Sequence, residues 1–196
     1  SPLDPMVAYT LGWIRGGLGD PDGAEAWYRR AAALPADGCF PARLVEIEIL
    51  LAASAAVPGD PRAPYYLGNL YYDRRRYDDA IACWRAARAL DPAFPTVHRN
   101  LGIAQANVLH AWAAAERSYR RAFACDPSDA RVLYELDQLQ KRRGAAPARR
   151  LRRLERQART CVSTGHRACK ANGKAASRSL VQGRLDARDR RGRRSP

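Results

Sequence analysis

Residues 61–94 read PRAPYYLGNLYYDRRRYDDAIACWRAARALDPAF and decide the fold. Apolar side chains recur at helical spacing on both sides of a polar turn at 74–78. Gly68 and Ala80 are small, and two antiparallel helices approach closely only where their side chains are minimal. Pro92 cannot continue the second helix, so the chain turns and begins again. The stretch therefore predicts a helical hairpin that can be repeated.

The same pattern recurs elsewhere in the chain. Gly68 aligns with Gly102, 34 residues later, and an earlier copy has Gly12 at the equivalent place. A small residue, an aromatic residue and an alanine follow each glycine at matching spacing, except for one residue inserted near His110. The aligned residues are Ala24, Tyr28 and Ala31, then Ala80, Trp84 and Ala87, then Ala115, Tyr119 and Ala122. The three copies span about 5–37, 61–94 and 95–129.

The repeated pattern resembles the tetratricopeptide repeat. The residues that carry the resemblance are Leu67, Gly68, Tyr71, Tyr77, Ala80, Trp84, Ala87 and Pro92. The later copy has Gln105 in place of the usual aromatic residue, and the earlier copy departs from the pattern at Arg15 and has Pro35 one residue early. The resemblance implies an all-α solenoid of antiparallel helix hairpins, a tetratricopeptide-like superhelix, over residues 1–158. One extra helix is expected at 42–57 and terminal helices at 130–158.

A narrower resemblance rests on three runs, FPARLVEIEILLAA, APYYLGNLYYDRRRYDDAIACWRAARALDPAFPTVHRNLGIA and DARVLYELDQLQKR. They look like the repeat region of large, mostly bacterial proteins that carry the domain of unknown function numbered 5107. This resemblance implies that the chain is a fragment lacking an upstream domain, which looks sugar-related in that family. An accessory module of a carbohydrate-related multidomain protein is therefore one alternative function.

The charge of the chain is unevenly placed. Its net charge is +14, yet residues 1–140 hold 15 basic and 17 acidic residues, whereas residues 141–196 hold 19 and 3. Residues 159–196 contain few large apolar side chains, so we expect a disordered Arg-rich tail. The tail is either a native basic segment or a non-native, out-of-frame translation. A native tail would allow non-specific, salt-dependent nucleic-acid binding as a second alternative function.

The resemblance also implies a concave groove lined by the first helix of each repeat. The first set of predicted groove residues is Arg62, Tyr65, Asn69, Tyr72 and Asp73. The next repeat adds Thr96, Arg99, Asn100, Ile103 and Asn107, and the last helix adds Arg131 and Tyr134. The function that follows is a protein–protein interaction scaffold that binds a peptide or partner protein in this groove.

A subset of the groove matches part of a two-carboxylate clamp, by which some such repeats hold an acidic C-terminus. Asn69, Asn100 and Arg131 match three of its five positions, and their amides and guanidinium suit a carboxylate. The other two positions, normally basic, are Tyr65 and Glu135, and Glu135 would repel the ligand. The alternative is that the asparagines only supply hydrogen bonds between helices.

Four tyrosines near the start of the second copy divide into two pairs. We expect Tyr66 and Tyr71 to lie in the core and Tyr65 and Tyr72 to face the groove as partner anchors. Tyr72→Ala is accordingly predicted to weaken partner binding without loss of helical content.

No group of residues in the sequence suggests catalysis, cofactor binding or metal binding. His98 and His110 have no nucleophile at a motif spacing, and the glycine-rich run 16–19 follows no strand, so no enzyme activity and no cofactor are predicted. Cys161, His166 and Cys169 lack a fourth ligand, so no metal site is predicted. Five cysteines without a dense framework and no long apolar run favour a cytoplasmic protein without membrane contact; the oligomeric state stays open.

Overall fold

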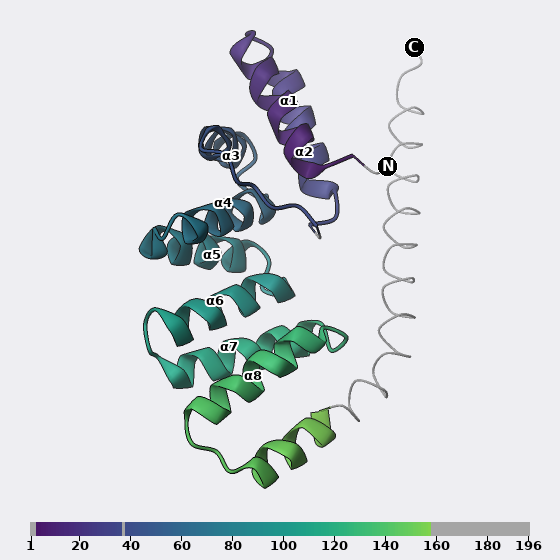
Figure 1. Ribbon diagram of the computed structural model, residues 1–196. Coiled ribbons are helices and arrows are strands. Elements are labelled where there is room, and N and C mark those ends of the chain that lie inside the picture. The colour runs from purple at the N-terminus through teal and green to yellow at the C-terminus, as the bar shows by residue number, and fades with distance from the viewer. Residues whose placement is uncertain (1–2, 37, 158–196) are drawn as a thin grey trace, which may run out of the picture. The chain divides into compact units, whose positions relative to one another are not determined.

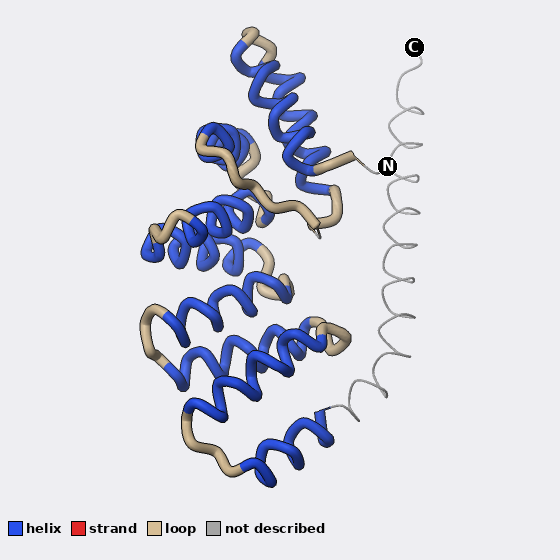
Figure 2. Tube along the Cα trace, viewed as in Figure 1, coloured by secondary structure: helices blue, strands red, loops and turns tan. Residues whose placement is uncertain are grey.

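The computed structural model describes residues 3–36 and 38–157 (Figure 1). Every regular element in these two ranges is a helix, as Figure 2 shows, which confirms the predicted all-α class. The chain divides into two compact units, Ser1–Asp126 and Pro127–Pro196, which are described separately. The expected disordered tail, 159–196, lies outside the described residues.

The first unit holds three helical hairpins and one single helix. Its elements are α1 (Pro5–Gly17), α2 (Pro21–Ala33), α3 (Val45–Ala56), α4 (Arg62–Asp73), α5 (Tyr77–Leu90), α6 (Pro95–Asn107) and α7 (Trp112–Cys125). The most extensive contacts join α1 to α2, α4 to α5 and α6 to α7. The single helix α3 packs against α1 and α4, and α5 packs against α6. The second and third hairpins are therefore each stacked on the helix that precedes them.

A glycine lies at the closest approach in each hairpin. A Cβ atom built on Gly12 would stand 2.6 Å from the Tyr28 ring, and one on Gly68 would stand 2.5 Å from the Trp84 indole. Gly102 meets Tyr119 in the same way, at 2.8 Å. The aromatic ring of each second helix occupies the space that a side chain on the first helix would need. The predicted pairing of small and aromatic residues is confirmed in all three hairpins.

Each hairpin turn contains one residue in the left-handed region of the backbone. These residues are Gly19 (φ 78°) between α1 and α2, Arg75 (φ 60°) between α4 and α5, and His110 (φ 50°) between α6 and α7. Glycine adopts this conformation readily, whereas a side chain makes it unfavourable. The turns before α2 and α5 share a further backbone hydrogen bond, from the Asp20 amide to the Arg15 carbonyl and from the Arg76 amide to the Tyr71 carbonyl. The turn before α7 differs, because the Ala111 amide bonds to the Gln105 carbonyl, one residue further back. In the last two turns the left-handed residue carries a side chain, at an energetic cost.

The core of the first unit follows the apolar faces of the hairpins. Tyr9, Tyr66 and Trp84 are buried in it together with the alanines of the second helices. Tyr66 and Tyr71 are both buried, which confirms their predicted place in the core. The Tyr66 hydroxyl is buried and has no hydrogen bond to a described oxygen or nitrogen atom.

The second unit contains α8 (Ala130–Arg142) and a further helix over 147–157. The Asp129 carboxylate accepts a hydrogen bond from the Arg131 amide at 3.0 Å and caps α8. Asp137 forms an ion pair with Arg150 through both carboxylate oxygens, one of them 2.8 Å from Nε, and this pair joins the two helices. The Arg150 guanidinium lowers the pKa of Asp137.

Candidate partner-binding site

Two asparagines from neighbouring repeats form the centre of the predicted groove. Asn100 on α6 donates from Nδ2 to Oδ1 of Asn69 on α4, at 2.8 Å. The same Asn69 oxygen accepts a bond from the Trp84 indole nitrogen, at 3.1 Å. Asn69 thus connects α4, α5 and α6 through a single atom. The hydrogen-bonding role that the sequence allowed for these asparagines is present in the structure.

The asparagine pair also has hydrogen-bonding atoms that these two bonds do not use. Asn69 Nδ2 and Asn100 Oδ1 make no hydrogen bond to another described residue, and both side chains are partly accessible. An amide carries two donor hydrogens and an oxygen with two lone pairs. The pair can therefore offer both a donor and an acceptor to a ligand.

Tyr72 and Asp73 lie at the C-terminal end of α4. The Tyr72 ring is partly buried against Tyr77 and Trp84, with ring centroids 5.1 and 5.4 Å away. Asp73 is exposed, and its carboxylate lies 3.7 Å from Nε of Arg74. Tyr72 combines a fixed ring position with an accessible part, which is the property of an anchor residue.

The predicted groove residues of α6 are accessible to different degrees. Asn107 is exposed at the end of the helix. The partly buried members are Thr96, Arg99 and Ile103. Together with Asn69, Tyr72 and Asp73 they place polar groups and one aliphatic side chain on the first helices of two adjacent hairpins.

Two predicted groove residues are occupied by contacts within the protein. Tyr65 is only 5% exposed, with its ring 5.1 Å from Tyr66 and 4.8 Å from Phe94, so the expectation of an accessible anchor is wrong for this side chain. The Arg62 guanidinium donates to the carbonyl oxygens of Ala32 and Leu34 at the end of α2. A cation at these carbonyls caps the C-terminal end of α2 and interacts favourably with the negative end of the helix dipole.

Arg131 and Tyr134 lie on α8, in the second unit. Arg131 is exposed and pairs with Asp129, with Nε 2.9 Å from the nearer carboxylate oxygen. Tyr134 is exposed, whereas Glu135 on the same helix is partly buried. Arg131 thus contacts the residue that caps the N-terminal end of its own helix, α8.

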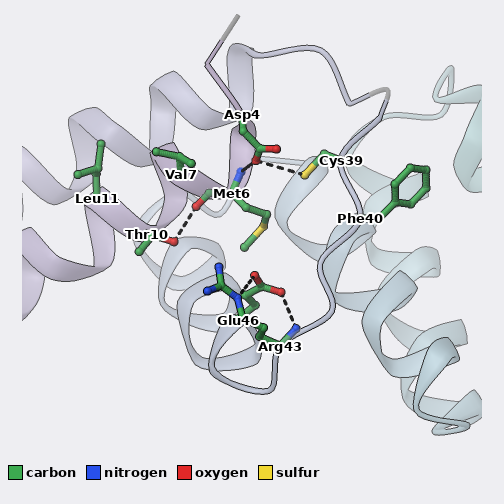
Figure 3. A pocket seen from close by; sticks show the side chains of 9 residues that line it. All are labelled: Asp4, Met6, Val7, Thr10, Leu11, Cys39, Phe40, Arg43 and Glu46. Atoms are coloured by element: carbon green, nitrogen blue, oxygen red, sulfur yellow. Dashed lines mark hydrogen bonds and ion pairs between the residues drawn. The ribbon is translucent and has the colours of Figure 1, made fainter. Parts of the chain in front are cut away.

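A pocket that the sequence did not suggest lies beside α1 in the first unit. Its volume is about 390 Å³, and Figure 3 shows side chains of α1 on one side and of the segment before and within α3 on the other. The lining residues are Asp4, Met6, Val7, Thr10, Leu11, Cys39, Phe40, Arg43 and Glu46. In the sequence, only Phe40 and the spacing of the apolar residues along α1 could have indicated this surface.

Two titratable groups of this pocket, Glu46 and Cys39, have structural roles. Glu46 is buried, and its Oε2 accepts hydrogen bonds from the amides of Ala42 and Arg43 at 2.7 and 2.8 Å. Burial raises the pKa of the Cys39 thiol to about 11, so it stays protonated near neutral pH. Neither group is arranged as a nucleophile or a base.

The described residues show no arrangement for catalysis or metal binding at the other candidates either. His98 is buried with Nε2 2.9 Å from the carbonyl oxygen of Pro92, and burial lowers its pKa. No cluster of three or more His, Cys, Asp or Glu side chains in the described ranges could bind a metal ion. The CysHisCys candidate at 161–169 lies outside those ranges. Within them, no helix is both long and apolar enough to span a bilayer.

Comparison with known proteins agrees with this architecture. The family described as TPR repeat matches residues 58–108. The peroxisomal targeting signal receptor of Eremothecium gossypii is 33% identical over 94 residues, which are 48% of this chain and 16% of the receptor. The chain therefore spans a small part of that relative's length.

Solved structures with a similar fold include a tetratricopeptide domain and MamA. The first TPR of Spaghetti (RPAP3), bound to the HSP90 peptide SRMEEVD, has a TM-score of 0.50 and 17% identity, covering 72% of this chain and 94% of that one. MamA (41-end) from Desulfovibrio magneticus RS-1 has a TM-score of 0.51 and 19% identity, covering 80% and 77%. At these identities the likeness concerns the fold alone. Residues 58–108 are thus a tetratricopeptide repeat by sequence, and the described helices have the tetratricopeptide-type fold.

Proposed function

We propose that the first unit is a protein-interaction scaffold that binds an extended peptide segment across α4 and α6. The observation that carries the proposal is the hydrogen-bonded pair of Asn69 and Asn100 on the first helices of adjacent hairpins. Tetratricopeptide-type repeats serve as scaffolds because each hairpin buries its apolar face only against its neighbours, which leaves a pre-formed surface on the stack.

The chemistry of the pair suits a peptide backbone. Each residue of an extended peptide presents one N–H donor and one C=O acceptor. Asn69 Nδ2 can donate to the peptide carbonyl, and Asn100 Oδ1 can accept from a peptide N–H, while their mutual bond stays in place. This recognition requires no charge on the peptide and allows its sequence to vary at the contact.

Residues on either side of the pair supply contacts for side chains of the peptide. Tyr72 and Ile103 offer apolar surface, and Asp73 and Asn107 offer exposed polar groups at the helix ends. An apolar centre with a polar rim is the usual composition of such interfaces. We therefore expect most of the binding energy at Tyr72 and at the asparagine pair.

An acidic C-terminus is a less suitable ligand. The peptide bound by the first TPR of RPAP3, SRMEEVD, ends in an acidic residue. In this chain the two positions of the clamp that are normally basic hold Tyr65, which is buried, and Glu135, which is negative. We therefore propose recognition of the peptide backbone rather than of a terminal carboxylate.

A peptide selection followed by affinity measurements tests the proposal. Random dodecapeptides displayed on phage are selected on the full chain, and the strongest are titrated against variants by fluorescence anisotropy. Asn69→Asp keeps the acceptor oxygen for Trp84 and Asn100 but removes the free N–H donors, so we expect a loss of about tenfold or more in affinity, equivalent to one hydrogen bond of about 1.4 kcal/mol. Tyr72→Ala is expected to weaken binding by a similar factor.

Arg85→Ala is the matched control, because Arg85 is an exposed side chain on α5. It is expected to leave the affinity unchanged, and circular dichroism should show the same helical content for all three variants. Equal affinities for wild type, Asn69→Asp and Tyr72→Ala would refute the site. Tight binding of SRMEEVD that is lost on amidation of its C-terminus would instead favour carboxylate recognition.

A further inference from the structure

Residues 141–157, in the second unit, carry a large excess of positive charge. They hold eight basic side chains and one acidic side chain, Glu155. One of the basic side chains, Arg150, is paired with Asp137 on α8, with Nε 2.8 Å from Oδ1. The seven others outnumber the four acidic side chains in the described part of this unit.

Four of these basic side chains share one face of the helix over 147–157, the last helix drawn as a ribbon in Figure 1. They are Arg149, Arg152, Arg153 and Arg156. Their spacing of i, i+3, i+4 and i+7 places them within about 100° of the helix surface and along about 10 Å of its axis. Like charges at these spacings destabilise a helix. Helix stability therefore does not explain this row, which we call the arginine face.

The arginine face borders a pocket. Its volume is about 410 Å³, and among the described residues only the four arginines of the face line it. The Arg149 and Arg152 side chains are exposed and make no hydrogen bond or ion pair with another described residue. A ligand in this space can therefore contact several guanidinium groups at once.

Contacts with α8 hold the arginine face in place. Gln140 on α8 is buried, and with its amide turned to satisfy both groups its oxygen accepts a hydrogen bond from Arg153 Nε at 3.2 Å. The pair of Asp137 and Arg150 joins the same two helices. The direction of the face is thus fixed before a ligand binds, which reduces the entropy lost on binding.

A row of guanidinium groups is suited to a row of phosphate groups. A guanidinium binds a phosphate through two parallel N–H donors. Each strand of a nucleic-acid duplex carries one phosphate per about 3.4 Å of helix axis, so about three phosphates fall within the length of the arginine face. A single phosphate would leave most of the four positive charges unused. The geometry therefore favours a polyanion with regularly spaced charges.

Three other anionic partners fit the arginine face less well. A membrane surface requires a broad apolar face on the same helix, but Leu151 is the only exposed large apolar side chain in the described part of 141–157. Single-stranded nucleic acid binds largely by stacking on aromatic rings, and residues 141–157 contain none. An acidic peptide must lose backbone and side-chain freedom, whereas the phosphates of a duplex are already arranged.

We propose that the arginine face binds the phosphate backbone of a nucleic-acid duplex without reading its base sequence. Arg149 and Arg152 contact phosphates of one strand, and Arg153, positioned by Gln140, contacts the same strand. Neutralisation of these phosphates releases bound counterions, so the affinity falls as the salt concentration rises. This site differs from the peptide site proposed on α4 and α6, and it precedes the Arg-rich segment 159–196.

Titrations of the full chain at several salt concentrations test the site. A short fluorescein-labelled DNA duplex of mixed sequence is titrated by fluorescence anisotropy between about 50 and 200 mM salt. Arg149→Gln with Arg152→Gln removes two phosphate contacts. The slope of log K against log salt should therefore decrease by about 2 in magnitude, and the affinity at the lowest salt should fall by about tenfold or more. Arg149→Lys with Arg152→Lys keeps both charges and should keep the slope.

The matched control is Arg85→Gln with Arg88→Gln. Both arginines are exposed on α5 in the first unit, so the control removes the same net charge and leaves the arginine face intact. It should bind the duplex as the wild type does. Circular dichroism should show equal helical content for both glutamine variants, because all four substituted side chains are exposed.

Three results would overturn the proposal. The first is an unchanged salt slope for Arg149→Gln with Arg152→Gln, since the duplex would then be bound elsewhere on the chain. The second is an equal loss of affinity in the control, since net charge alone would then account for binding. The third is tighter binding of single-stranded DNA, polyglutamate or phosphatidylserine vesicles than of the duplex at the same salt, lost in the Arg149 and Arg152 variant. The face would then serve one of those other partners.

Discussion

The Tyr9 phenol on α1 donates a hydrogen bond of 2.6 Å to Oδ2 of Asp60, which stands two residues before the start of α4. The Asp60 carboxylate also accepts bonds from the amides of Arg62 and Ala63, at 2.8 and 3.3 Å, and so caps α4. Asp60 is buried, and its bond to Tyr9 is one reason why the pKa of Tyr9 is raised, after burial itself. One carboxylate thus joins the first hairpin to the start of the second.

Removal of the Tyr9 hydroxyl should destabilise the first unit. Tyr9→Phe deletes a bond to a buried, charged acceptor, so the free energy of unfolding should fall by about 1–3 kcal/mol in urea titrations. Tyr66→Phe is the matched control, because the buried Tyr66 hydroxyl has no hydrogen bond to a described oxygen or nitrogen atom and only the weakly hydrogen-bonding Cys39 thiol beside it. That variant should be as stable as the wild type or slightly more stable. A greater loss from Tyr66→Phe than from Tyr9→Phe would contradict the assignment of Asp60.

The turn residues predict a substitution that stabilises the protein. Arg75 has a φ of 60°, and glycine at this position should raise the free energy of unfolding by about 1 kcal/mol because it removes the side-chain penalty of the left-handed conformation. Gly19→Ala, at the equivalent turn between α1 and α2, should lower it by a similar amount. Thermal unfolding measures both changes, and a Tm that moves in the same direction for the two variants would disprove the shared turn geometry.

Two substitutions of Asn69 should differ in their effect on the free energy of unfolding. Asn69→Ala removes the acceptor for both Trp84 and Asn100, so a loss of about 1–2 kcal/mol is expected in chemical denaturation. Asn69→Asp retains an oxygen at the same place and should keep most of the stability. If both variants were equally destabilised, the oxygen would not be the connecting atom between α4, α5 and α6.

Burial of His98 predicts a pH dependence. Desolvation is the main cause that lowers its pKa from 6.5, with smaller effects of Arg121 and Arg88 in the same direction; the Pro92 carbonyl and Asp91 oppose them. The unfolded chain therefore binds a proton at a higher pH than the folded chain does. The contribution of His98 to the free energy of unfolding is therefore present above pH 6.5 and is lost as the pH falls from there through the lower pKa of the folded state.

His98→Gln tests this dependence because it removes the titrating group. Between pH 7.5 and 5, urea midpoints of the wild type should decline more steeply than those of the variant. Parallel curves over this range would show that other groups cause the decline.

The hairpins could be predicted from the sequence, because Gly68 and Trp84 meet within one local unit whose spacing is visible in the chain. The equivalent pairs in the other two copies follow by alignment. The alternative use of the asparagines as hydrogen bonds between helices was also foreseeable, since Asn69 follows Gly68 by one residue and Asn100 precedes Gly102 by two, which places both on the first helices of adjacent repeats.

The surroundings of the site could not be predicted in full, because they depend on contacts that the repeat pattern does not specify. Phe94, in the loop before α6, covers Tyr65, and the end of α2 takes up the Arg62 guanidinium. The pattern of one repeat contains no information about either contact. The resemblance to proteins with the domain numbered 5107 stays a prediction.

The central claim is that small residues at the contact between paired helices determine this fold, and Gly68→Ala tests it most directly. Its Cβ would lie 2.5 Å from a Trp84 indole that is buried and bonded to Asn69, so the ring cannot move aside freely. Thermal and urea unfolding should show a loss of about 1–3 kcal/mol. Gly17→Ala, at the end of α1 with no atom within 4 Å of its Cβ, should be neutral or stabilise by up to about 1 kcal/mol. Equal stability of Gly68→Ala and Gly17→Ala would contradict the claim.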